Sequence, residues 1–329
     1  MWIVCRGVSA SKKDQTENHW IKDRSFGAPK DPRINQEKVD TNHSKSATSI
    51  GSSVKCPCGE YARNEFDKHE TITVNYKSTK TINLDIRSGQ KIGIGANGKT
   101  FHAIWKDKCV ALKISEPKSV GEIERAKNEI KILKKLNGKD GIIKFYGSQI
   151  EEINGQTKVS IVMELGGKNL IEYIIERKKD IKDEEELYEL IIKVVTGAAI
   201  ALSNFHKSGG IHLDIKPENF VVSKKQNNEF MIVSKLIDFD LSHLLQQGQD
   251  SIDLNGAIVG TIGYIAPEYF DLRFFWCFSR RKNPKITRKA DVYSFGVLIF
   301  KLVYKLEEEL TRYSGNKAKF ISRARIFRH

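Results

Sequence analysis

The chain has 329 residues, with 55 Lys and Arg side chains against 41 Asp and Glu and a formal net charge of +14. Its hydrophobic content of 40% is ordinary for a globular protein and excludes collagen-like, mucin-like and wholly disordered chains. No apolar run approaches the ~18 residues that cross a bilayer, and the start lacks the pattern of a secretory signal. The 5 scattered cysteines favour a reducing compartment, so we predict an intracellular protein without a transmembrane segment, cytoplasmic, nuclear or both.

The chain changes character within its first quarter. Residues 1–69 are polar with little periodicity, so we predict a disordered N-terminal extension. From about Thr71 to Ile114, apolar and polar residues alternate, which predicts β-strands. Ser119 and Glu122 then have the spacing of a capping box and begin a helix with one apolar face.

The following elements combine short strands with longer helices. In chain order we predict strands at 141–147 and 159–163, a helix over 184–205, strands at 220–222 and 236–237, and a helix over 291–304. Strands with one helix, followed by a mainly helical part, predict an α+β fold of two lobes with a cleft between them.

The basic excess gathers in the last part of the sequence. Residues 273–329 hold 15 basic side chains against 4 acidic ones, whereas the middle of the chain is close to neutral. Such a segment suits weak contact with an acidic partner, nucleic acid or an anionic membrane surface. A solvated tail without a dedicated partner is the simpler interpretation.

A glycine-rich run, Gly93-Ile94-Gly95-Ala96-Asn97-Gly98, stands between two predicted strands. A dinucleotide-binding fold needs a helix after such glycines, but Lys99–Trp105 predicts a strand. We therefore expect Gly93, Gly95 and Gly98 at a hairpin tip, where backbone N–H groups can approach phosphate oxygens. Glycine-rich turns are common, so the run by itself is a weak indication.

One strand and the capped helix each carry a charged residue with a notable position. Alternation over Val110–Ile114 places Lys113 opposite the apolar side chains, either in the cleft or in solvent. Glu129 lies in the apolar stripe of the helix, between Ala126 and Leu133. Because an unpaired buried carboxylate is costly, we expect Lys113 to be its partner. The alternative is a glutamate at the edge of the stripe.

The stretch Ile211–Phe220 concentrates imidazole, carboxylate, ammonium and carboxamide groups. It precedes Asp238-Phe239-Asp240 and a Gly260–Glu268 run that ends in Ala-Pro-Glu. The other motifs are the glycine run, Lys113 on its strand, Glu129 on its helix and the helix start at Asp291–Gly296. Together these motifs have the order found in eukaryotic protein kinases, which the chain resembles over residues 90–304. The resemblance implies a bilobal kinase fold and transfer of the γ-phosphoryl group of ATP, with Mg²⁺, to Ser or Thr hydroxyls of protein substrates.

The resemblance also implies roles for single residues. For catalysis, Asp214 would accept the substrate hydroxyl proton and Lys216 would lie near the γ-phosphoryl group. Lys113 would contact the α- and β-phosphates and be held by Glu129. Asn219 and Asp238 would bind Mg²⁺. The residues implied for ATP are Gly93, Gly95 and Gly98 over the phosphates, Met163, Glu164 and Leu165 in the gatekeeper and hinge, and Ala111 and Val221 on either side of adenine.

Finer assignments follow from the same motifs. Lys216, two residues after Asp214, and the Gly-Thr-x-x-Tyr-x-Ala-Pro-Glu run resemble the Ser/Thr-directed branch. Three short stretches are similar to the monopolar-spindle checkpoint kinases: Asn128-Glu129-Ile130, Val162-Met163-Glu164 and Lys216-Pro217-x-Asn219-Phe220. The predicted domains are the extension 1–69, a kinase domain 70–304 with lobes of about 70–163 and 167–304, and a basic tail 305–329.

Three features depart from the family's pattern. Leu213 stands where many kinases have an arginine that pairs with an activation-loop phosphate, so we predict that phosphorylation of Ser242 or Ser251 is not the main switch. Asp240 replaces the glycine of the DFG triplet, which restricts the backbone and adds a carboxylate near the metal site, with an effect on activity of either sign. Only 38 residues follow Asp291, which predicts a shortened C-lobe. The alternative function is therefore a catalytically weak or inactive kinase-like module that binds ATP or a partner.

Two local patterns leave their interpretation open. The aromatic stretch Phe274–Arg281 either covers core that the shortening leaves bare or forms a patch for a partner or a membrane surface. Cys56-Pro57-Cys58 with His69 resembles half a zinc site, which Cys5, His43 or another distant residue would have to complete.

Overall fold

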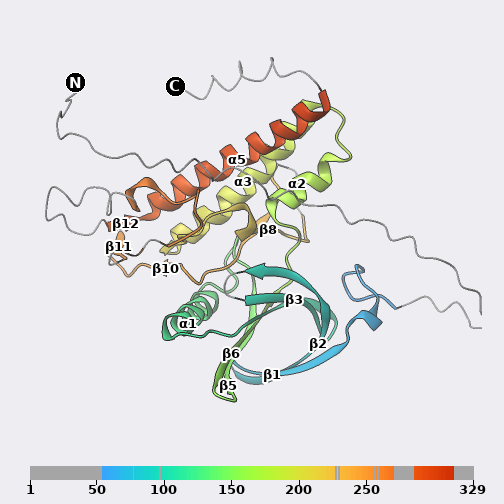
Figure 1. The fold of residues 1–329 in the computed structure, drawn as a ribbon, viewed down its shortest axis with the longest axis vertical. Helices are drawn as coiled ribbons and strands as arrows, with labels where there is room; N and C mark the ends of the chain where they lie inside the picture. The colour runs from blue at the N-terminus through green and yellow to red at the C-terminus, as the bar shows by residue number, and fades with distance from the viewer. Residues whose placement is uncertain are drawn as a thin grey trace, which may run out of the picture. The chain divides into compact units, whose positions relative to one another are not determined.

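The computed structural model describes residues 54–269 and 285–314, apart from 77, 96, 97, 227, 229, 255, 256 and 258. A curved sheet with one helix comes first in the chain, and a mainly helical part follows (Figure 1). The predicted two-lobed α+β arrangement is therefore confirmed.

A six-stranded antiparallel sheet forms the first part. Its strands are β1 (Lys68–Tyr76), β2 (Ser78–Gly95), β3 (Gly98–Trp105), β4 (Lys108–Ser115), β5 (Phe145–Ile153) and β6 (Gln156–Glu164). They lie in the order β1-β2-β3-β4-β6-β5. The sheet curls so that its outer strands, β1 and β5, meet. The contact includes a hydrogen bond from the Thr73 backbone N–H on β1 to Gln149 Oε1 on β5 at 2.6 Å. At this junction a Cβ on Gly147 would come within 2.5 Å of the Val74 side chain, so only glycine fits.

Helix α1 (Val120–Lys135) packs against β5 and β6. The predicted N-cap is present, since Ser119 Oγ accepts the Glu122 backbone N–H at 3.3 Å. The return bond of the predicted capping box differs, because the Glu122 carboxylate accepts the N–H of Lys118 at 2.8 Å in place of that of Ser119. The helix buries Ile130, Ile132 and Leu133, and Glu129 lies on the same buried face. The apolar stripe therefore directs one carboxylate toward the sheet.

The second part consists of helices and short two-stranded ribbons. The helices are α2 (Leu170–Lys178), α3 (Glu184–Lys207) and α5 (Arg288–Ser314), with 3-10 turns at Pro217–Asn219 and Pro267–Tyr269. The ribbons pair β7 (Gly210–Ile211) with β10 (His243–Leu244), β8 (Phe220–Val222) with β9 (Ser234–Leu236), and β11 (Ser251–Asp253) with β12 (Lys285–Thr287). Helices α3 and α5 lie side by side (Figure 1).

Most differences from the predicted elements concern boundaries. The predicted helices over 184–205 and 291–304 are present, and the second continues to Ser314, ten residues into the segment predicted as a tail. Helix α2 is an unpredicted element, and its available signal is the capping box between Asn169 and Glu172. Among the described residues, no helix combines the length and apolar character needed to cross a membrane.

Residues 54–67 fold against the sheet, although the sequence predicts disorder up to residue 69. Lys55 bridges Ala62, a 3-10 turn follows at Arg63–Glu65, and Cys56 and Phe66 are buried in a cluster with Ile104. A few buried apolar side chains are enough to hold this polar stretch against the sheet. The average composition of residues 1–69 does not reveal them. Residues 1–53, Phe274–Arg281 and the basic end beyond Ser314 lie outside the described residues.

Candidate functional site

The first group of site residues surrounds Lys113 on β4. Its Nζ donates to Glu129 Oε1 at 2.8 Å and to Asp238 Oδ1 at 2.7 Å. Glu129 is only 3% exposed, so the interpretation of a glutamate at the edge of the stripe is excluded. Asp238 follows β9 in the second part of the chain, so one ammonium group joins the sheet, α1 and the loop after β9.

Burial and charge act on this group in opposite directions. Burial disfavours the charged form of Lys113, but the attraction of Glu129 and Asp238 outweighs it and raises the pKa of Lys113. Burial raises the pKa of Glu129 to about 7 against the attraction of Lys113. Burial also works to raise the pKa of Asp238, but Lys113 outweighs it and the net shift is downward. The cleft thus contains a lysine that stays protonated and is fixed from two sides.

The second group surrounds Asp214, in the loop between β7 and β8. Asp214 Oδ1 accepts the Thr261 hydroxyl at 2.6 Å, and Oδ2 accepts Lys216 Nζ at 2.7 Å and Asn219 Nδ2 at 3.0 Å. Lys216 Nζ also donates to Thr261 Oγ1 at 2.8 Å. Three donors therefore hold the carboxylate in one orientation. Thr261 is a site residue that sequence reasoning missed, although its Gly-Thr run was noted.

Asp291, in the first turn of α5, holds this loop from the other side. Its Oδ2 accepts the His212 backbone N–H at 2.7 Å, and its Oδ1 accepts the Leu213 N–H at 2.8 Å. His206 Nε2 lies 2.8 Å from Asp291 Oδ2. The sequence predicts Asp291 only as a helix start, because nothing local indicates contact with a loop 78 residues away.

Two non-glycine residues of the site have a left-handed backbone, with φ of 69° at Leu213 and 64° at Asp238. Such conformations cost about 1–3 kcal/mol each and persist where surrounding contacts enforce them. Here the Leu213 N–H is bound by Asp291, and the Asp238 carboxylate is bound by Lys113. Gly260, at φ 107°, lies so close that a Cβ would come within 2.5 Å of the Leu213 carbonyl oxygen.

Asn219 and Asp238 lie at adjoining ends of the β8–β9 ribbon, since the Ile237 N–H donates to the Asn219 carbonyl oxygen at 3.0 Å. Asn219 Nδ2 is bound to Asp214, which directs the amide oxygen away from that contact. An amide oxygen next to a carboxylate supplies the hard oxygen ligands that Mg²⁺ prefers. The residues present therefore fit a divalent cation.

The glycine run forms the turn of the β2–β3 hairpin, as its flanking pattern predicts. Gly95 pairs with Gly98 and Gly93 with Thr100. Gly98 has φ 153°, and a Cβ there would come within 2.6 Å of the Ile114 carbonyl oxygen. The hairpin and Lys113 line one cavity.

The residues assigned to adenine line the same cavity; they are Ala111, Met163, Glu164, Leu165 and Val221. Ala111 on β4 pairs with Met163 on β6. The Glu164 side chain turns away to Lys235, whose Nζ lies 2.7 Å from Glu164 Oε1. Glu164 therefore contributes to this wall mainly through its backbone.

The departures from the family's pattern are buried. Leu213 is 7% exposed and belongs to an apolar cluster with Leu245, Ile252 and Tyr269. Asp240 is 5% exposed, and burial together with the negative charge of Asp238 raises the pKa of Asp240. An apolar Leu213 cannot pair with a phosphate, which supports the prediction on phosphorylation.

The predicted half zinc site needs correction. His69 does not face Cys56 or Cys58: its ring is 83% exposed, and Nδ1 lies 2.6 Å from Asp85 Oδ1. The alternation of β1 turns this side chain to solvent. Cys5 and His43 lie outside the described residues.

Comparison with known proteins agrees with this geometry. The family model described as "Protein kinase domain" matches residues 86–325. CDPK-related kinase 8 of Arabidopsis thaliana is 29% identical over 253 residues, which are 74% of this chain and 37% of that protein. Calcium/calmodulin-dependent serine/threonine-protein kinase 1 of Oryza sativa subsp. japonica is 31% identical over 225 residues, or 65% of this chain and 33% of that protein. Cysteine-rich receptor-like protein kinase 29 of Arabidopsis thaliana is 25% identical over 252 residues, 74% of this chain and 33% of that protein.

The matches assign the chain to a family but cover only part of each relative. The chain spans about a third of the length of the curated relatives it matches. The relatives give no support to the predicted likeness to monopolar-spindle checkpoint kinases. They agree with the family model on the superfamily, and the chain belongs to the protein kinase domain family.

Proposed function

We propose that the chain catalyses transfer of the γ-phosphoryl group of ATP to Ser or Thr hydroxyls of protein substrates. The observation that carries this proposal is the pair of fixed groups facing one cavity: the Lys113 ammonium held by Glu129, and the Asp214 carboxylate held by Lys216, Asn219 and Thr261. Phosphoryl transfer depends mainly on positioning and on neutralising oxygen charge, which such groups can supply.

In the proposed reaction the substrate hydroxyl oxygen attacks the γ-phosphorus of ATP. The bond between the γ-phosphorus and the oxygen that bridges the β- and γ-phosphates breaks, and ADP leaves. The hydroxyl proton passes to Asp214, whose orientation is set by Thr261 and Lys216. Lys113 would contact the α- and β-phosphates under the glycine hairpin of Gly93, Gly95 and Gly98. When Mg²⁺ is bound, Asn219 and Asp238 would hold it, and it would neutralise phosphate charge.

The preference for Ser and Thr rests on Lys216, two residues after Asp214, and on the Gly260–Glu268 run. The name of one relative, a calcium/calmodulin-dependent serine/threonine-protein kinase, is in line with it. An intracellular location and contact of the basic segment 273–329 with acidic partners or nucleic acid stay predictions.

A second candidate is a kinase-like module that binds ATP but turns over poorly. Asp240 favours it, because this residue places a second, buried carboxyl group close to Asp238, where it can disturb the metal site that the resemblance implies. The module would retain the adenine wall and Lys113.

The deciding experiment is a phosphotransfer assay on the purified chain with labelled ATP, Mg²⁺ and basic Ser, Thr and Tyr peptides. We expect label on the Ser and Thr peptides and none with Asp214→Asn. Equal signal in both proteins, or none in either despite measurable Mg·ATP binding, would favour the module. Label on the Tyr peptide alone would contradict the Ser/Thr assignment.

A further inference from the structure

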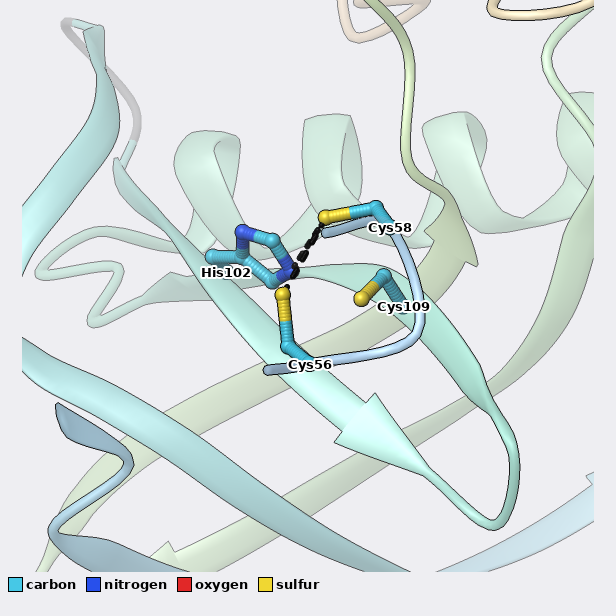
Figure 2. Close-up of side chains that lie close together, drawn as sticks. All are labelled: Cys56, Cys58, His102 and Cys109. Carbon is cyan, nitrogen blue, oxygen red and sulfur yellow. Dashed lines mark hydrogen bonds between the residues drawn. The ribbon is translucent and has the colours of Figure 1, made fainter. Parts of the chain in front are cut away.

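Four metal-ligating side chains converge on one face of the β3–β4 hairpin, outside the groups assigned to phosphoryl transfer. Cys56 and Cys58 come from the segment before β1, His102 from β3 and Cys109 from β4. Each offers one ligand atom, and these atoms all lie within 4.8 Å of one another. Figure 2 shows the three thiols and the imidazole directed toward a common point.

The β3–β4 hairpin explains why His102 and Cys109 meet. In this antiparallel pair Ile104 is opposite Cys109, and His102 is opposite Ala111. Because side chains alternate along a strand, His102, Ile104 and Cys109 lie on one face of the hairpin. The histidine and the cysteine are therefore diagonal neighbours.

A tight turn brings the other two ligands to this face. We call residues 54–62 the CPC loop. The Gly59 N–H donates to the Cys56 carbonyl oxygen and the Cys56 N–H to the Tyr61 carbonyl oxygen, both at 2.8 Å. Gly59 has φ 78°, a conformation that favours glycine. The turn places the Cys56 and Cys58 sulfur atoms 3.3 Å apart.

His102 is buried without a strong hydrogen-bond partner among the described residues. It is 1% exposed, and its Nδ1 has no hydrogen-bond partner among the described residues. Its Nε2 lies 3.8 Å from Cys58 Sγ, longer than a good hydrogen bond. Tyr61 and Phe66 pack edge-on against the ring with centroids at 5.3 Å. A cation at Nε2 would give the buried ring a strong partner on the side that faces the thiols, and the ring proton would then stay on Nδ1.

The donor set selects the ion. Three thiols and one imidazole match the Cys₃His set of tetrahedral zinc sites, with zinc–sulfur distances of about 2.3 Å. The ligand atoms of such a site lie about 3.5–3.8 Å from one another. The distances from Cys58 Sγ to Cys56 Sγ, 3.3 Å, and to His102 Nε2, 3.8 Å, are close to this spacing, and all four ligand atoms lie within 4.8 Å of one another. Soft thiolates disfavour Mg²⁺ and Ca²⁺. The alternative is a group of reduced thiols that pack as small apolar side chains.

We propose that Cys56, Cys58, His102 and Cys109 form a structural zinc site that fastens the CPC loop to the β3–β4 hairpin. Four protein ligands leave no open position for a substrate, so the site stabilises the fold and takes no part in catalysis.

The site has a consequence for the neighbouring cavity. Glu60 of the CPC loop pairs with Lys224, just after β8, with Oε1 and Nζ 2.5 Å apart. Cys58, Glu60 and His102 line the same cavity as Ala111. Zinc would therefore hold an ion pair that links the segment before the sheet to the second part of the chain, beside the adenine wall.

The test is metal analysis of the full chain purified under reducing conditions without chelator. We expect one zinc per chain, and after chelator treatment we expect added Co²⁺ to give a thiolate charge-transfer band and the intense d–d bands of a tetrahedral site. X-ray absorption of the zinc-loaded chain should show three sulfur neighbours and one nitrogen neighbour. A wild-type chain with no zinc and no cobalt spectrum would overturn the proposal without any variant having to fold.

Matched variants separate this site from the sequence-based alternative. Cys109→Ser and His102→Gln should each lose the zinc, whereas His69→Gln, at the exposed histidine, should retain it. Zinc lost with His69→Gln but kept with Cys109→Ser would overturn the ligand set. Chelation should also speed tryptic cleavage after Arg63 at least tenfold, and unchanged cleavage would contradict the fastening role.

Discussion

The Asp291 carboxylate accepts the backbone N–H of Leu213 at 2.8 Å, across 78 residues of sequence. Leu213 has φ 69°, so this hydrogen bond holds a conformation that a non-glycine residue rarely adopts. A second bond from the His212 N–H makes Asp291 the residue through which α5 shapes the loop that carries Asp214.

We predict that Asp291→Ala lowers the free energy of unfolding by about 3 kcal/mol, because it removes two charge-assisted hydrogen bonds from a buried loop. Urea unfolding of the purified chain measures this. Glu124→Ala is the control, since its pair with Lys127 is exposed and exposed pairs contribute about 0–1 kcal/mol. Equal midpoints for the two variants would show that the loop does not depend on Asp291.

We predict that Lys113→Met abolishes phosphotransfer and destabilises the chain, because it leaves the buried Glu129 and the partly exposed Asp238 without their shared cation. Breaking such a group costs about 3–5 kcal/mol, whereas removing a second partner relieves part of it. Adding Glu129→Leu should therefore raise the unfolding midpoint above that of Lys113→Met alone. A lower midpoint in the double variant would mean that Glu129 has another stabilising role.

We predict that Thr261→Val lowers kcat about 100-fold, because misplacing a catalytic group by about 1 Å costs that much. The hydroxyl donates to the Asp214 carboxylate, so we expect the substitution to act on kcat and to change KM for ATP little. Steady-state kinetics separates the two parameters. Thr71→Val, on the exposed side of β1, is the control. A rise in KM at constant kcat would assign Thr261 to ATP binding instead.

We predict that Ser251→Ala keeps activity within about twofold of the wild type, because the Ser251 hydroxyl donates to the neighbouring Asp250 carboxylate at 2.8 Å and not to a residue of the site. Ser251 is 8% exposed, Ser242 is 0% exposed, and Leu213 is apolar, so a phosphate on either serine would lack an arginine at that position. Phosphotransfer by the Ser251→Ala and Ser251→Glu variants measures this. Loss with alanine and rescue with glutamate would establish the switch that we exclude.

Local patterns were sufficient for the pair at the centre of the cleft. Alternation along β4 put Lys113 opposite Val110 and Leu112, and the stripe of α1 put Glu129 toward the sheet. Both inferences use periodicities of 2.0 and 3.6 residues, which depend only on the backbone of one element. The spacing of motifs then identified the family without any knowledge of contacts.

Local patterns failed where apolar contacts are few or partners are distant. The CPC loop lies in a polar stretch whose composition predicts disorder, yet Cys56 and Phe66 are buried against Ile104. Thr261 and Asp291 carry no signal of their own, because their roles exist only through Asp214 and Leu213.

The sequence by itself determined the two-lobed α+β pattern and the order of the motifs, since these follow from periodicity and spacing. The resemblance of those motifs to protein kinases then supplied the expected fold and the expected residue roles. The tertiary structure alone decided which partners meet. It gave Lys113 a second carboxylate in Asp238, and it placed His102 and Cys109, in place of His69, beside Cys56 and Cys58. The physical reason is that each site is built from side chains on separate elements. These side chains come within bonding distance only when the β3–β4 hairpin, the CPC loop and the two sides of the cleft have folded together. The formal net charge of +14 carries no information about such contacts.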